Sequence, residues 1–153
     1  MKKAMAMAFA IPAAMALSAA LAKADHPKGF STKSLQGTYA ATFHGSVDGT
    51  GVVTADGAGN ITTGTETVND GTNSCTGTLT GSYTVNADGT GILTLSFSTT
   101  KTIFGACPSV PTSNSAAIAF VSPDEIEVSG TDPGVLVSGS LARQAPPFHL
   151  GHD

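Results

Sequence analysis

The chain has 153 residues, of which 12% are charged and 18 are glycine, and it contains no Trp and only 2 Tyr. This length predicts one domain. The composition excludes a charge-driven disordered chain and argues against a helical bundle, whereas the abundance of Gly and Thr suits short β-strands joined by turns. The net charge of −4, with no Lys or Arg cluster, argues against binding to nucleic acid or to an anionic membrane surface.

Residues 1–22 have the features of a secretory signal peptide. The segment Met1–Lys3 carries two positive charges and precedes an apolar run that is too short to span a bilayer comfortably. Two A-x-A cleavage motifs follow, ending at Ala22 and Ala24. The alternative is a membrane-anchoring helix, which Pro12 would interrupt. We therefore expect a protein exported to the periplasm or the medium, which in its mature form is not an integral membrane protein.

Beyond a lead-in over residues 23–34, which we expect to be flexible, apolar and polar residues alternate with the period of a β-strand. No stretch of the mature chain shows helical periodicity. The strand-like runs cover residues 38–43, 50–55, 60–68, 75–85, 91–97, 116–121, 125–129 and 135–141. They predict a single β-domain over residues 35–144 and a flexible tail over residues 145–153.

The connections between these runs indicate how the strands pair. Four Asp-Gly pairs, which begin at Asp48, Asp56, Asp70 and Asp88, are strong hairpin signals, and only the linker over residues 99–114 is long. Short connections make neighbouring strands antiparallel. We predict an all-β fold, an antiparallel up-and-down meander of about eight strands that closes into a barrel and so leaves no exposed edge. An open sandwich is the alternative, and a transmembrane barrel is disfavoured because aromatic girdles are missing.

Cys75 and Cys107 are the only cysteines. An even count in an exported chain favours one disulfide between them, which would close a loop of about 33 residues and stabilise the fold by roughly 3–4 kcal/mol. A reactive or metal-binding thiol pair is the alternative, but no CxxC spacing and no nearby His supports it.

The interior of such a barrel would be poor in large side chains. Several small residues lie within strand runs and leave space wherever they point inward, namely Ala41, Gly77, Gly81, Ala117, Ala119 and Gly139. An eight-stranded barrel is just wide enough either to be filled by side chains or to hold one small ligand. The side chains that we expect to line the interior and contact a ligand are Tyr39, Phe43, Leu79, Tyr83, Leu95 and Phe120.

Three segments carry a resemblance to a known group of proteins. They are Leu35–Tyr39 (LQGTY), Thr54–Ile61 (TADGAGNI) and Gly81–Gly91 (GSYTVNADGTG). This pattern resembles that of small exported bacterial proteins with the sequence L-x-G-x-Y, then DGxGN, then G-x-Y-T-V-N-x-D-G-T-G, and Val137–Gln144 is similar to their closing strand. The resemblance implies the barrel of allene oxide cyclases and, more remotely, of calycins. No cyclase catalytic residue maps onto a position of this chain, and the lipocalin G-x-W signature is absent.

The sequence offers little chemistry. The motifs GxSxG, HExxH, GxxxxGK[ST] and GxGxxG are all missing. Glu125 and Glu127 lie on one strand face and form a candidate carboxylate pair, but a solvated strand face explains them better. Glu66 is the one acid well inside a strand pattern, where a role in the lumen is open. The Asp-Gly pairs offer too few oxygens for a calcium loop, and His149 and His152 lie in the tail, so we expect no catalytic residue, no metal and no cofactor.

Three functions of different classes remain. The first is an exported protein that binds a small apolar or amphipathic molecule in its barrel, and the second is a structural or surface module with a filled core. The third is an isomerase of the allene oxide cyclase type, which comes last because no catalytic constellation is visible. The ligand and the oligomeric state are not encoded in any motif.

The mature protein is expected to begin at Lys23 or Asp25, directly after one of the two A-x-A motifs. N-terminal sequencing and intact-mass measurement of exported material test this. Exported protein that retains Met1 would contradict it.

Overall fold

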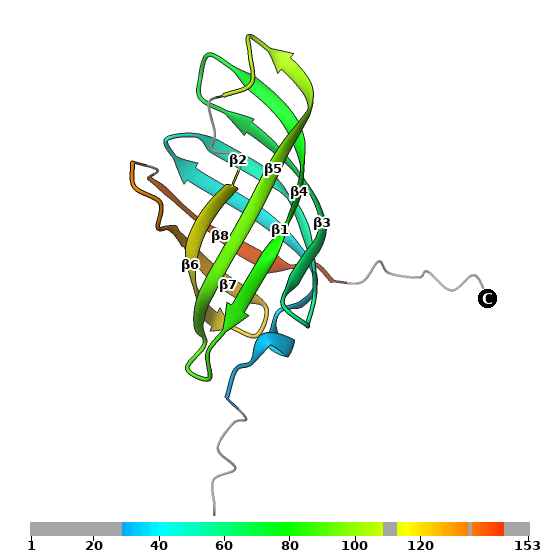
Figure 1. Cartoon of the computed structure of the whole chain (residues 1–153), viewed down its shortest axis with the longest axis vertical. Helices are drawn as coiled ribbons and strands as arrows, with labels where there is room; N and C mark the ends of the chain where they lie inside the picture. Colours follow the sequence, from blue (N-terminus) through cyan, green and yellow to red (C-terminus); the bar gives the residue numbers. More distant parts are fainter. Residues whose placement is uncertain (1–28, 109–112, 135, 146–153) are drawn as a thin grey trace, which may run out of the picture.

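The computed structural model describes residues 29–108, 113–134 and 136–145, so the predicted signal peptide and most of the predicted tail lie outside the described residues. Eight strands form one closed antiparallel barrel in chain order (Figure 1). They are β1 (Gln36–Gly45), β2 (Asp48–Asp56), β3 (Asn60–Asn69), β4 (Ser74–Val85), β5 (Thr90–Phe104), β6 (Ser113–Ser122), β7 (Glu125–Gly130) and β8 (Val137–Arg143). The predicted all-β meander and its closure are both confirmed.

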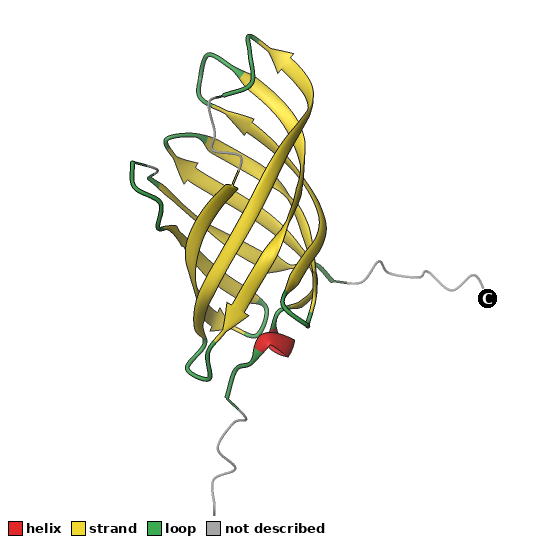
Figure 2. Cartoon of the chain, in the orientation of Figure 1, coloured by secondary structure: helices red, strands yellow, loops and turns green. Residues whose placement is uncertain are grey.

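Closure depends on the pairing of the first strand with the last. β8 pairs with β1 from Tyr39 opposite Arg143 to Gly45 opposite Val137, so both edges of the sheet are satisfied. The only helix among the described residues is η1 (Thr32–Ser34), a single short turn (Figure 2). No helix in that part of the chain is therefore long enough to cross a membrane.

The two ends of the barrel differ. We call the end next to η1 the lower end and the opposite end, which carries the β1–β2, β3–β4, β5–β6 and β7–β8 connections, the upper end (Figure 1). At the upper end β3, β4 and β5 project beyond the other strands. The predicted linker over residues 99–114 is therefore shorter than expected, because β5 continues to Phe104, where it pairs with Ser74.

Three of the four Asp-Gly pairs form hairpin turns, and their chemistry is alike. Gly57, Gly71 and Gly89 adopt positive φ angles of 76°, 90° and 87°, which favour glycine. In each turn the preceding aspartate accepts hydrogen bonds from backbone N–H groups, as Asp56 does from Ala58 at 2.7 Å. The Asn60 and Asn73 side chains, which donate to Asp56 and Asp70, and these backbone bonds together hold the pKa of the aspartates below the usual range, that of Asp56 at about 2.

The fourth pair differs from the prediction. Asp48 and Gly49 begin strand β2, and the turn lies one step earlier, at Ser46 and Val47. The Ser46 N–H donates to the carbonyl of Leu136 at 2.7 Å, so this turn is held by the neighbouring β7–β8 connection. The pairing of the strands at the upper end thus determines the position of this turn.

The chain before β1 closes the lower end. The described part of the predicted lead-in, residues 29–34, lies against the barrel, where the Phe30 N–H donates to the carbonyl of Ala87 at 3.1 Å. Leu35 follows η1 and is almost fully buried in the core. The Tyr83 hydroxyl, inside the barrel, donates to the Leu35 carbonyl at 2.6 Å and so fixes this closing segment.

Arg143, near the end of the described chain, ties the same end together. Its guanidinium lies 5.0 Å from the centre of the Tyr39 ring and pairs with Asp124 at 2.9 Å. It also donates to the carbonyls of Ser34, at 3.2 Å, and Gln36. The β8 terminus, the β6–β7 turn and the segment before β1 are thereby held at one point.

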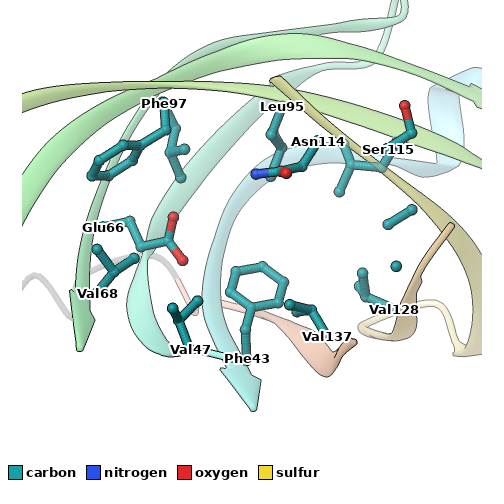
Figure 3. Close-up of a pocket in the computed structure, with 14 residues that line it drawn as sticks. Phe43, Val47, Glu66, Val68, Leu95, Phe97, Asn114, Ser115, Val128 and Val137 are labelled. Carbon is teal, nitrogen blue, oxygen red and sulfur yellow. The ribbon is translucent and has the colours of Figure 1, made fainter. Parts of the chain in front are cut away.

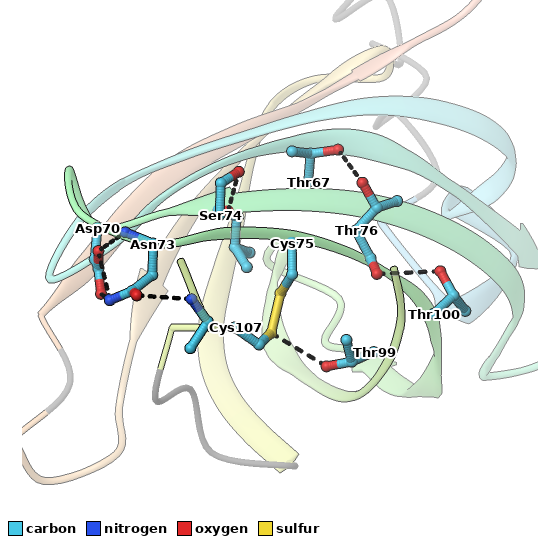
Figure 4. The surroundings of a disulfide bond; sticks show 11 residues. Thr67, Asp70, Asn73, Ser74, Cys75, Thr76, Thr99, Thr100 and Cys107 are labelled. Atoms are coloured by element: carbon cyan, nitrogen blue, oxygen red, sulfur yellow. Dashed lines mark hydrogen bonds between the residues drawn. A yellow bond between two sulfur atoms is a disulfide. The ribbon is translucent and has the colours of Figure 1, made fainter. Parts of the chain in front are cut away.

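A disulfide between Cys75 and Cys107 is present near the upper end (Figure 4). It joins β4 to the connection that follows β5. The Asn73 side-chain oxygen accepts a hydrogen bond from the Ala106 N–H at 2.9 Å beside it. The start of the long β5–β6 connection is thus fixed to the sheet.

Replacing Tyr83 with Phe should lower the free energy of unfolding by about 1–2 kcal/mol, because the buried Leu35 carbonyl loses its donor. Tyr39→Phe is the matched control, since its hydroxyl makes only a long contact of 3.4 Å with the Gln36 carbonyl, and it should cost clearly less. Urea unfolding of the three proteins provides the comparison. Equal losses in both variants would contradict the role given to Tyr83.

Candidate functional site

A cavity lies inside the upper half of the barrel and opens at the upper end. Its volume is about 90 Å³. Most of its wall is apolar, and its principal apolar side chains are Phe43, Val68, Leu79, Leu93, Leu95 and Phe97 (Figure 3). The polar members of the wall are Glu66, Asn114 and Ser115.

Small residues in the upper half of the barrel let neighbouring groups approach closely. Gly77 is covered by the Phe97 ring, which would collide with a Cβ at that position. A Cβ at Gly139 would meet the backbone of β1, so β8 approaches β1 closely there. Ala116 contributes only a methyl group to the cavity wall. The lower half, by contrast, is filled by large buried residues, among them Tyr39, Ile126 and Leu141.

Glu66 reaches the cavity through an irregularity in β3. Strict alternation from the buried Ile61 would place residues 63, 65 and 67 inside and Glu66 outside. The pairing of β3 shifts by one residue between Ile61 and Thr65, and beyond the shift Gly64, Glu66 and Val68 face inward. This β-bulge therefore turns the carboxyl group into the barrel.

The Glu66 carboxyl group is held among apolar neighbours. A Cβ at Gly49, on the adjacent strand, would overlap one of its oxygens, so this glycine provides the room for it. Burial raises the pKa of Glu66 from 4.5 to about 7. Within the described part of the chain, no group donates a hydrogen bond to this carboxyl and no cation pairs with it.

The side chains expected to contact a ligand separate into two groups. Phe43, Leu79 and Leu95 line the cavity. Tyr39 and Tyr83 lie in the filled lower half, and Phe120 packs against Phe30 with ring centres 4.7 Å apart. The structure thus brings three of the six together, and their role in binding stays a prediction.

Several wall residues were missed by sequence reasoning. Asn114 fell within the predicted linker, and Val68 and Phe97 stood in strand runs without being chosen for the lining. Phe97 shares its strand face with Leu95, and that alternation was a usable signal. Asn114 had none, because only its pairing with Leu95 makes it part of β6.

The other candidate groups lie on the outer surface. Glu125 and Glu127 are exposed, whereas Ile126 and Val128 between and beside them are buried. His44 contacts Asp48 at 3.1 Å on the exposed face. His26, His149 and His152 lie outside the described residues, and over residues 29–108, 113–134 and 136–145 no group of three His, Cys, Asp or Glu side chains could hold a metal ion.

Comparison with known proteins identifies the fold and nothing more specific. No protein-family model matches the chain, and no curated protein matches it. A redesigned β-barrel, mFAP1 bound to DFHBI, is similar with a TM-score of 0.52 and 20% identity over 73% of this chain and 97% of that chain. A second solved structure, a fluorescence-activating β-barrel designed de novo, has a TM-score of 0.48 and 15% identity over 74% of this chain and 96% of that chain. At such identity the first likeness supports the barrel fold alone.

The raised pKa of Glu66 makes stability depend on pH in a defined window. Between pH 4.5 and about 7 the folded protein holds a proton that the unfolded chain has released. Stability should therefore fall as the pH rises through this window, by up to about 3 kcal/mol in total. The turn aspartates, whose pKa is lowered from 3.8, lose their stabilising effect only at lower pH, outside this window.

Glu66→Gln should abolish this decline and should unfold at higher urea concentration than the unmodified protein at pH 8. Glu127→Gln is the matched control, because Glu127 is exposed on the outer face, and it should leave the pH profile unchanged. Urea unfolding at pH 5, 6, 7 and 8 measures both. A decline that persists in Glu66→Gln would assign the dependence to another group.

Proposed function

We propose that the exported, mature protein binds one small apolar or amphipathic molecule in the upper cavity without transforming it. The supporting observation is an open, mainly apolar cavity at one end of a barrel whose other end is filled. Burial of apolar surface would drive binding, and the few polar groups of the wall would orient the ligand. Export is supported by the disulfide, which persists in oxidising compartments.

The volume of the cavity limits what can enter it. A cavity of about 150 Å³ can hold one benzene, and this one measures about 90 Å³. A ligand would therefore insert a short chain or part of a ring and leave its remainder at the mouth. Ile103, Phe104 and Leu136 are exposed near the upper ends of the strands and would offer apolar contacts there.

A barrel with this fold can hold a small molecule, since the structure of mFAP1 contains DFHBI. The competing hypothesis of a structural module with a filled core accounts for the lower half of the barrel and leaves the upper cavity without a purpose. The binding hypothesis accounts for both halves, and we therefore prefer it.

Isomerase activity, which the resemblance to allene oxide cyclases implies, is the second candidate. One observation favours it: Glu66 combines access to the cavity with a pKa of about 7, which suits a general acid or base near neutral pH. Within the described residues Glu66 is the only titratable side chain of the cavity wall, so a second acid–base partner is missing there. Recovery of a bound ligand in altered form would favour this candidate.

Ala116→Phe should fill part of the cavity and weaken the binding of phenylbutanol, a neutral probe with one ring, by at least about tenfold. Ala119→Phe adds the same ring to the outer face of the same strand and should leave the affinity unchanged. Isothermal titration calorimetry measures the affinity, and circular dichroism verifies that both variants fold. Unchanged affinity in a folded Ala116→Phe protein would place the probe elsewhere.

A further inference from the structure

The strongest feature of the cavity is that its wall is apolar around one carboxyl group. Figure 3 shows Glu66 pointing into the cavity between the rings of Phe43 and Phe97, with Asn114 directed into the same space from β6. Gly49 leaves the space that the carboxyl group occupies. The bulge in β3 and a glycine on β2 thus act together to place an acid inside the barrel.

Within the described residues, burial is the only influence on the Glu66 carboxyl group, and no hydrogen bond or cation compensates it. Phe43, Val68 and Phe97 beside it cannot donate a hydrogen bond, and the polar wall residues Asn114 and Ser115 on β6 make none to it. A carboxylate in such surroundings is costly unless it gains a donor or a cation. A ligand that brings its own cation would remove that cost.

We propose that the ligand class of this cavity is an amphipathic amine, whose ammonium group pairs with the Glu66 carboxylate while its apolar body lies against Phe43, Leu95 and Phe97. This inference deepens the proposed binding function and rests on it. The proposal also predicts different affinities for ligands that share an apolar body and differ in their polar headgroup. A carboxylate headgroup would face a like charge, and a hydroxyl would gain one hydrogen bond without charge compensation.

No other charged group of the surrounding strands faces Glu66 in the described structure. His44 on β1 and Asp48 on β2 contact each other on the exposed surface. The Asp70 carboxylate, at the end of β3, accepts hydrogen bonds from its own turn, and Lys101 on β5 is exposed. Asp132, in the β7–β8 connection, accepts a hydrogen bond from the Ser115 N–H at 2.7 Å, so its carboxylate is engaged with the backbone of β6. Glu66 is therefore the titratable side chain of the cavity wall whose ionisation gives binding its pH dependence.

Binding of an ammonium ligand requires the ionised carboxyl group, so the proton of Glu66 passes to solvent. With a pKa of about 7, about a tenth of Glu66 is ionised at pH 6 and about nine-tenths at pH 8. The ligand amine stays protonated at both pH values. The apparent affinity for an amine should therefore rise about tenfold from pH 6 to pH 8.

The experiment uses three probes with one apolar body: phenylbutylamine, phenylbutanol and phenylbutyrate. Isothermal titration calorimetry of the mature, disulfide-bonded protein in two buffers of different ionisation enthalpy gives both the affinity and the number of protons released. The amine should bind tightest at pH 8, gain about tenfold in affinity from pH 6 to pH 8 and release a proton at pH 6. The alcohol should show neither effect, and the affinity of the butyrate should fall as the pH rises.

Two variants and two outcomes decide the matter. In Glu66→Gln the amine should lose its advantage over the alcohol and its proton release, whereas Glu127→Gln, altered on the outer face, should retain both. If the alcohol binds and the amine binds no tighter and releases no proton, the amine class is wrong and the binding function stands. If none of the three probes binds, both proposals fail.

Discussion

The narrow interior of an eight-stranded barrel is the constraint on which this structure depends. Such an interior accommodates one layer of side chains or one small ligand, so the volume of the inward residues at each level determines whether that level is filled. Tyr39, Tyr83 and Leu141 fill the lower half. At the upper level Ala116 contributes only a methyl group to the wall, and the side chains there leave a cavity of about 90 Å³.

The two ends of the barrel therefore have different physical roles. At the lower end Leu35 is buried beneath η1, and Arg143 joins the segment before β1 to the β6–β7 turn, so entry from that side is closed. The disulfide between Cys75 and Cys107 lies at the opposite, upper end, where β4 and β5 extend beyond the other strands. The contacts that close the barrel thus lie at one end and the accessible volume at the other, a division that agrees with the proposed binding function.

Much of this fold could be predicted from the sequence, because its signals are local. Alternation and Asp-Gly turns located all eight strands, and the turns at Asp56, Asp70 and Asp88 formed where their side chains could accept backbone hydrogen bonds. The level of each side chain along the barrel axis is not local, because it depends on the register between strands. For that reason Tyr83 and Leu79, on one face of one strand, could not be assigned to the filled end and to the cavity in advance.

Glu66 shows why the candidate site was harder to predict than the fold. The sequence marks it as an acid inside a strand, but regular alternation from Ile61 gives it the wrong face. One additional residue in β3 forms a bulge, and the side chains that follow it in β3 therefore point to the opposite face from the one that regular alternation predicts. Gly49 on the paired strand must also be small, or the carboxyl group would have no room. The placement of an acid in this apolar cavity thus depends on two backbone features, a bulge in β3 and a glycine on β2, that no chemical motif records.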